Sequence, residues 1–224
     1  MSENNQEVNV GNTKSTGIAD QLLAIRRELI IGFALIVVTV LAFQGYHWLE
    51  KRQEIKANEA YYFLKARNQI TDNTENLSKK EVQDSIRQFI KDHASRSVAK
   101  SAALDLAKYY ESIDNFKAAY ETLSLVQVKK ISSIMDGLYK YRLAVSMQKN
   151  QDCQQAISVF DEIINSRKQA DLIAPSMLQK ALCLENIGKK DEAMAAYENL
   201  ISTYGDTDTG KKAEKYLILL KMGA

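Results

Sequence analysis

The residues of this sequence that could do chemistry are few and scattered. His47 and His93 each stand alone, and neither Cys153 nor Cys183 lies in a CxxC pair or near a histidine at metal-binding spacing. Motifs of phosphate-binding loops, zinc proteases, nucleophile elbows and calcium loops are also missing. Because a catalytic or metal site needs several such groups together, we predict no catalytic residue, no metal and no cofactor, and hence no enzyme.

The two cysteines allow two interpretations. They can be small apolar packing residues, or they can form a disulfide if the domain lies in an oxidising compartment. The sequence does not show whether their Cα atoms approach closely enough for a bond. The acidic pairs Asp161-Glu162 and Asp191-Glu192 are predicted to lie on solvent-facing sides of helices.

Composition indicates an all-α protein. The 224 residues include one proline and nine glycines, and strand-like alternation of Val, Ile and Thr is hard to find. The formal net charge is +2, without a dominant basic block. Nucleic-acid binding, which needs a clustered basic face, is therefore not expected.

An uncharged apolar run from Leu29 to Phe43 predicts a transmembrane helix. Extended to Leu49, it reaches about twenty residues, enough to cross a hydrocarbon core of about 30 Å. We assign residues 1–24 to a disordered polar tail and residues 25–49 to a membrane anchor. The residues expected to contact lipid or its interface are Leu29, Ile36, Val40, Phe43 and Trp48. A buried core helix and a cleavable signal peptide remain alternatives.

The charges beside this run leave its orientation open. Lysines and arginines occur on both sides: Lys14, Arg26 and Arg27 before it, and Lys51, Arg52, Lys56 and Lys65 after it. The positive-inside rule therefore leans slightly against export of the C-terminal domain, although long domains can override it.

The rest of the chain repeats every 37 residues. Ala119, Ala156 and Ala193 share this spacing. Each is preceded by another alanine at −12 and followed by large apolar residues at +4 and +7. These residues are Ala107, Ala144 and Ala181; Leu123, Phe160 and Tyr197; and Val126, Ile163 and Leu200. This periodicity, interrupted by polar turns at 112–115, 148–152 and 185–189, predicts stacked helical hairpins.

Three hairpins are predicted over residues 97–207, and the segments before and after them are expected to depart from the repeat pattern. Residues 50–96 are expected to form a linking helix and a degenerate first hairpin. The helix 55–70 would pack through Tyr62, Phe63, Ala66 and Ile70, and the next through Val82, Ile86 and Phe89. Residues 208–224 are expected to form a capping helix with a polar outer side. Its packing residues would be Ala213, Tyr216, Leu217 and Leu220.

The repeats resemble the tetratricopeptide repeat family, most closely at 188–193 and in the pairs Ala156/Phe160 and Ala193/Tyr197. Their period is longer than the usual of about 34. The resemblance implies a right-handed superhelix in which the first helices of the hairpins line a partner-binding groove. By family register, the groove residues are Leu104, Lys108, Glu111, Tyr141, Val145, Gln148, Leu178, Leu182 and Glu185.

The whole-chain layout resembles the ancillary subunit family of the bacterial SecYEG translocon. The lead-in 25–27 to the apolar run and the segment 101–107 carry this resemblance. It implies a single-pass protein of the bacterial inner membrane whose repeats face the periplasm. Its implied partners are SecYEG, periplasmic chaperones and exported chains. A generic membrane-tethered scaffold is the main alternative, and a lipid or small-ligand carrier, which would need a closed apolar pocket, is a third.

Overall fold

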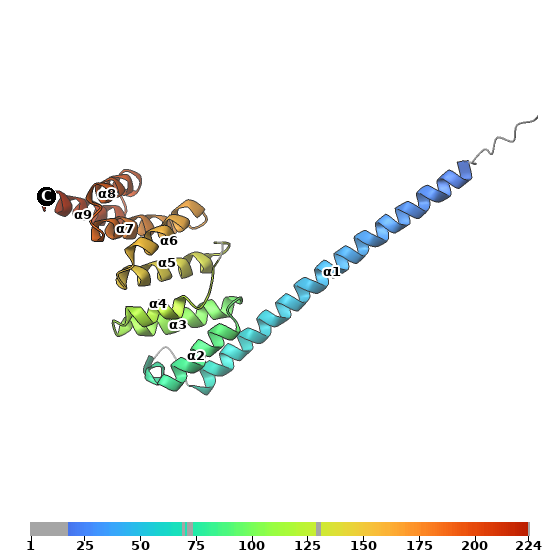
Figure 1. Cartoon of the computed structure of the whole chain (residues 1–224), viewed down its shortest axis with the longest axis horizontal. Helices are drawn as coiled ribbons and strands as arrows, with labels where there is room; N and C mark the ends of the chain where they lie inside the picture. The colour runs from blue at the N-terminus through green and yellow to red at the C-terminus, as the bar shows by residue number, and fades with distance from the viewer. Residues whose placement is uncertain (1–17, 69, 71–73, 129–130, 224) are drawn as a thin grey trace, which may run out of the picture. The chain divides into compact units, whose positions relative to one another are not determined.

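The computed structural model describes residues 18–68, 70, 74–128 and 131–223, and these form helices without any strand (Figure 1). The helices are α1 (Ile18–Arg67), η1 (Thr74–Ser78), α2 (Lys80–Asp92), α3 (Ser97–Ser112), α4 (Phe116–Leu123), α5 (Ile134–Lys149), α6 (Cys153–Ser166), α7 (Ala170–Asn186), α8 (Lys190–Tyr204) and α9 (Asp208–Met222). The predicted all-α fold is confirmed. Most of the predicted tail lies outside the described residues, but α1 already begins at Ile18, since 18–24 contains no helix breaker.

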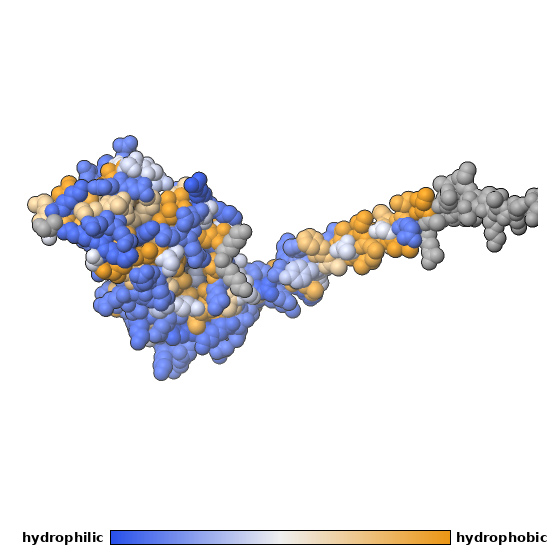
Figure 2. Space-filling view, turned by 45° about the horizontal axis from the view of Figure 1, so that its top comes forward, coloured by the Kyte–Doolittle hydropathy of each residue, from blue (hydrophilic) through white to orange (hydrophobic). Residues whose placement is uncertain are grey.

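The chain divides into two compact units, residues 1–53 and 54–224. In the first unit, α1 leaves Leu29, Ile36, Val40, Phe43 and Trp48 exposed by 47% or more. Figure 2 shows apolar surface along this stretch of helix. Among the described residues, α1 is the one helix long and apolar enough to cross a membrane, and none of its apolar window is buried. A soluble protein's core helix would instead be covered by its own fold.

The 37-residue pattern correctly identified the core of the second unit. The helix pairs α3–α4, α5–α6 and α7–α8 pack as three hairpins, and each also packs against the next. Ala119, Ala156 and Ala193 are completely buried. Because alanine adds so little volume, the two helices of each hairpin can approach closely at these positions. The large apolar residues at +4 and +7 are buried as predicted.

The predicted polar turns lie between the helices of each hairpin and share one backbone geometry. Asp114, Gln151 and Gly188, which are 37 residues apart, have φ angles of 57°, 66° and 77°. Each turn also contains the same long backbone hydrogen bond. The N–H groups of Asn115, Asp152 and Lys189 donate to the carbonyl oxygens of Tyr110, Met147 and Leu184 at 2.8, 2.9 and 2.9 Å. This left-handed ending satisfies carbonyls at the end of the first helix before the second begins.

The first hairpin packs through a different face of α1 than predicted. Tyr62 and Phe63 are 73% and 70% exposed. The buried stripe is instead Ala57 and Tyr61, with Tyr61 stacked on Phe89 at 5.2 Å. Ile70 is buried, but α1 ends at Arg67, so Ile70 does not follow the helical periodicity that placed Tyr62 and Phe63 inside. In α2, Val82, Ile86 and Phe89 are buried as predicted.

Helix α9 caps the repeats with a less polar surface than predicted. Ala213 and Leu217 are buried against α8, and Tyr216 stacks on Tyr197 at 6.1 Å while staying 37% exposed. The lysines at 211, 212 and 215 are exposed as predicted. However, the last turns also expose apolar side chains: Ile218, Leu219 and Met222, by 52%, 55% and 78%. A polar capping face therefore describes only the first half of α9.

Candidate interaction surfaces

All nine predicted groove residues lie on the first helices of the hairpins, α3, α5 and α7. Helix α3 contacts α5, α5 contacts α7, and α7 contacts α9. These contacts place the first helices side by side, which is the arrangement in which repeat proteins of this kind can line a groove. The three sets of residues are not equally available, because several also hold neighbouring helices together.

The first set, on α3, is the most open of the three. Leu104, Lys108 and Glu111 line a hollow of about 130 Å³ together with Leu138 and Arg142 of α5. Glu111 accepts a hydrogen bond from Nη1 of Arg142 at 2.9 Å, which fixes the charged side of this hollow. Leu138 and Arg142 did not emerge from the sequence, because their place depends on how α5 lies beside α3.

The apolar surface continues beyond this hollow to the start of α5. Ile134, Met135 and Leu138 are exposed by 81%, 37% and 37%. These residues are close together on the first turns of the helix. The sequence signal for them was the apolar Ile-Met pair directly after the Ser133 cap. The 37-residue register did not reveal them, because the equivalent positions in the next repeat are Asp171 and Leu172.

The second set, on α5, is partly structural. Tyr141 and Val145 are half-buried and pack against the core around Phe160, with 6.1 Å between the Tyr141 and Phe160 rings. Burial raises the pKa of Tyr141, although a hydrogen bond with Gln179 and the charge of Arg142 oppose this shift. Oε1 of Gln148 is buried and accepts no hydrogen bond from the described residues.

The third set, on α7, is committed further to the fold. Leu178 is buried, and Leu182 packs half-buried against the core between α7, α8 and α9. Glu185 accepts a hydrogen bond from the Tyr197 hydroxyl at 2.9 Å. Burial, and then this carboxylate, raise the pKa of Tyr197 well above its usual range. Since Leu178 is covered, only the half-buried Leu182 and Glu185 of this third set could contact a partner.

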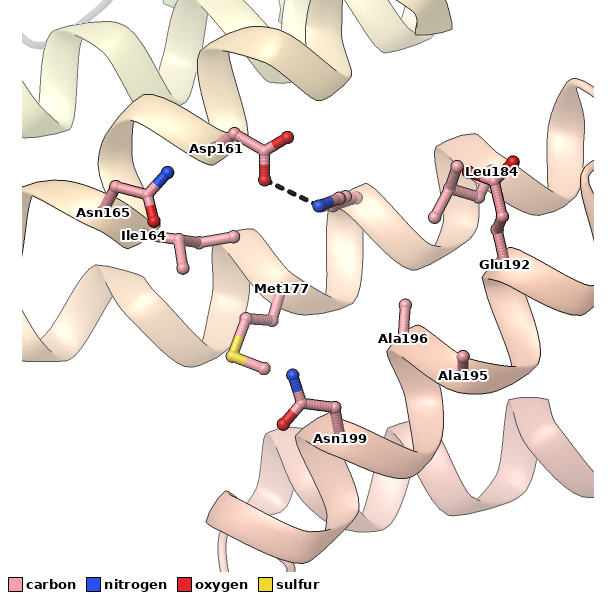
Figure 3. A pocket seen from close by; sticks show the side chains of 10 residues that line it. Asp161, Ile164, Asn165, Met177, Leu184, Glu192, Ala195, Ala196 and Asn199 are labelled. Atoms are coloured by element: carbon pink, nitrogen blue, oxygen red, sulfur yellow. Dashed lines mark hydrogen bonds and ion pairs between the residues drawn. The ribbon is translucent and has the colours of Figure 1, made fainter.

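A second kind of surface lies between the second helices. A hollow of about 460 Å³ is lined from α6, α7 and α8. Figure 3 shows the side chains that line it. Its apolar side chains include Ile164, Met177 and Leu184, and an ion pair of 2.7 Å between Lys180 and Asp161 crosses its edge.

The preceding repeat has an equivalent hollow of about 400 Å³ between the end of α4, α5 and α6. Most of its lining residues lie 37 positions before a residue that lines the hollow of about 460 Å³. The matched pairs include Ser124/Asp161, Gln127/Ile164, Val128/Asn165, Lys140/Met177, Leu143/Lys180, Val159/Ala196 and Glu162/Asn199. An ion pair between Lys140 and Glu162 crosses this hollow. Both hollows are open and carry charges, unlike the closed apolar pocket that a lipid carrier would need.

These surfaces define a helical-repeat protein of the kind that typically acts as a non-catalytic scaffold for protein–protein interaction. A sequence model of the tetratricopeptide repeat-like domain matches residues 26–222, so the chain belongs to this family. The match includes the apolar stretch of α1 as well as the repeats. A comparison with curated proteins gives no match.

Solved structures with the same fold include a putative kinesin light chain from Podosopora anserina with nearly identical TPR-like repeats. It has 14% sequence identity and a TM-score of 0.53, and the alignment covers 75% of this chain and 87% of that chain. A single-residue variant of that protein gives the same identity and TM-score, with 86% of that chain covered. At this identity the likeness shows the fold alone.

Proposed function

We propose that this chain is a membrane-anchored protein-binding module that serves the bacterial translocon. Its repeats would hold exported chains and periplasmic chaperones close to SecYEG, as the resemblance in whole-chain layout implies. The observation that carries the proposal is the combination in one family match of an uncovered apolar helix with three complete repeat hairpins. Residues 25–49 would be the anchor, and residues 97–207 would bind partners in the periplasm.

The mechanism is non-covalent. Helix α1 continues without interruption from the apolar stretch to Arg67, where its last turns pack into the first hairpin. The anchor therefore keeps the repeats at the membrane, which raises the local concentration of any bound chain beside the translocation pore. Apolar side chains on α3 and α5 would contact unfolded segments, and the ion pair between Arg142 and Glu111 beside them would orient these segments.

Photocrosslinking in native membranes tests this proposal. A photoreactive residue at Lys108, which is exposed on α3, should give adducts with translocon subunits and exported chains. The same residue at Gln154, which is exposed on α6, is the matched control and should give fewer adducts. Equal labelling of both positions, or labelling of neither translocon nor exported chains, would contradict the proposal.

Two substitutions test the groove itself. Tyr141→Ala and Leu182→Ala should reduce adduct formation at Lys108, because both remove apolar surface from the inner helices. Since both side chains are half-buried, each should also lower the free energy of unfolding by about 2–4 kcal/mol. Helicity measured by circular dichroism separates loss of binding from loss of fold. Unchanged crosslinking in a folded variant would exclude the groove.

The alternative is a scaffold that assembles a fixed envelope complex. The two ion-paired hollows between the second helices favour it, because a repeated, charged surface fits a folded partner better than varied unfolded chains. The crosslinking experiment separates the two proposals: a scaffold would give one constant set of partners that does not change when protein export is blocked.

A further inference from the structure

Cys153 and Cys183 lie together in the core although 30 residues separate them in sequence. Cys153 is the first residue of α6 and Cys183 lies in the last turn of α7. They are 3% and 0% exposed, and they share a core cluster with Ala144, Met147 and Phe160. Within this cluster the Cys153 side chain neighbours the Cys183 thiol.

The packing of the repeats does not require sulfur at either place. The positions equivalent to Cys183 in the two preceding repeats hold Ser146 and Tyr109, and the position equivalent to Cys153 holds Phe116. Among the described residues, no group of three metal-binding side chains occurs, so the pair is not part of a recognisable metal site. Nδ2 of Asn186 lies 3.9 Å from Sγ of Cys153.

We infer that Cys153 and Cys183 form an intramolecular disulfide when the repeat domain is in an oxidising compartment. This inference rests on the proposed export of the repeats. The bond would join the start of α6 to the end of α7, which is the open end of this helix pair. The loop after Ser166 already joins the other end, so both ends of the pair would then be covalently linked.

The bond forms by thiol–disulfide exchange with a disulfide donor, such as oxidised glutathione or a dithiol oxidase. One cysteine thiolate attacks the donor disulfide, and a mixed disulfide forms as one donor thiol leaves. The second thiolate attacks the protein sulfur of this mixed disulfide, and the second donor thiol leaves. The two cysteines together lose two protons and two electrons, which reduce the donor to two thiols.

Burial restricts when this exchange can occur. Burial, and then the neighbouring Cys153, raise the pKa of the Cys183 thiol well above its usual range, so few thiolates form in the closed structure. Exchange is therefore expected during folding, or when the first turn of α6 opens and exposes Cys153. Once the helices close, the same burial protects the bond from reductants.

Refolding of the purified full-length chain in detergent tests the inference. We expect refolding in a glutathione redox buffer to link the peptide containing Cys153 to the peptide containing Cys183, as identified by non-reducing peptide mapping. The oxidised protein should melt about 5–10 °C higher than the reduced protein. Thiols that stay reduced, or bonds only between chains, would overturn the inference.

Two variants keep this test independent of folding defects. Cys183→Ser copies the serine found at the equivalent position 146, and Cys183→Ala removes the polar group. We expect both to fold with native helicity and to show no rise in melting temperature in the redox buffer. A rise equal to that of the unmodified chain would overturn the inference, because the stabilisation would then come from elsewhere.

Trapping in cells separates this inference from the proposed function. Acid quenching followed by alkylation with a mass tag should show the pair oxidised in cells. If the purified chain forms the bond but the cellular protein is reduced, export of the repeats is wrong and the chemistry of the pair stands. If the purified chain does not form it, the inference fails and the proposed function is unaffected.

Discussion

Asp114, Gln151 and Gly188 occupy the same position in three successive turns, and all three adopt positive φ angles. Only the third is glycine, the residue without a steric penalty in this region. Gln151→Gly should therefore raise the free energy of unfolding by about 0.5–1 kcal/mol, and Gly188→Gln should lower it by about 1 kcal/mol. Urea unfolding measures both. Equal effects of the same sign would show that this turn geometry is not the cause.

Asp136 links the cap of α5 to the preceding hairpin. Its carboxylate accepts hydrogen bonds from Ser132 and Ser133 and forms an ion pair with Lys100, while the Ser133 hydroxyl accepts from its backbone N–H. Burial alone would raise the pKa of Asp136, but these hydrogen bonds outweigh it and hold that pKa well below its usual value. The ionised form is therefore the one that the fold stabilises.

This arrangement predicts a specific acid dependence. Because the folded pKa is lowered, the stabilisation is present above the unfolded pKa of about 3.9 and is lost as pH falls towards the folded value. Asp136→Asn should cost about 2–3 kcal/mol at pH 7, and much less at pH 2. Thermal unfolding across this range measures the difference. A gap that stays constant from pH 7 to pH 2 would exclude the ionised carboxylate as its source.

Sequence reasoning at this scale worked where local periodicity decides a side chain's surroundings. It placed the repeat alanines and their large apolar partners inside, because the 37-residue register fixes the buried face of each helix. It could not place Cys153 beside Cys183 or Arg142 beside Glu111, since these contacts depend on how separate helices are packed. The nine predicted groove residues remain predictions as binding residues.

At the scale of elements, the close approach of α7 and α8 depends on Ala193. This residue is completely buried, while Ala195 on the same helix is exposed. Ala193→Leu should lower the free energy of unfolding by about 1–3 kcal/mol, because the two helices must separate to hold the larger side chain. Ala195→Leu is the matched control and should change it by less than about 0.5 kcal/mol. Chemical denaturation compares them, and equal losses would contradict this packing.

The first turn of α9 requires a glycine for a different reason. A Cβ atom on Gly210 would lie 2.1 Å from the carbonyl oxygen of Tyr204, a backbone atom that cannot simply move aside. Gly210→Ala should therefore destabilise the docking of α9 by about 1–3 kcal/mol. Gly223→Ala, whose nearest neighbour would lie at 3.5 Å, is the control. Amide hydrogen exchange should show faster exchange in α9 of the first variant alone.

At the scale of elements, sequence patterns predicted the turns but not every buried or exposed helix face. Polar turns were located correctly, because each interrupts a clear helical periodicity. The packing face of α1 was wrong, because Ile70 was aligned with a helix that ends three residues earlier at Arg67. The exposed Ile218, Leu219 and Met222 of α9 were not anticipated, since an apolar residue near a helix end does not reveal whether another element covers it.

For the whole molecule, the proposed function requires the apolar part of α1 to span a membrane. Its uncovered side chains suit lipid, and a charge placed at the centre of a membrane helix costs about 2.5–3.5 kcal/mol. We expect the double variant Ile36→Lys, Val40→Lys to leave the membrane fraction for the soluble fraction. Lys51→Gln, outside the apolar run, should remain membrane-bound. Carbonate extraction followed by fractionation measures this, and an unchanged distribution of the double variant would contradict an anchor.

The most direct test of the proposed function is to determine on which side of the membrane the repeats lie. The flanking charges lean slightly against export, whereas the whole-chain resemblance implies it. Two reporters fused after Ala224 distinguish the two orientations. One reporter is active only outside the cytoplasm, and the other is active only inside it. We predict activity from the first reporter alone. Activity from the cytoplasmic reporter alone would contradict a role beside the periplasmic face of the translocon.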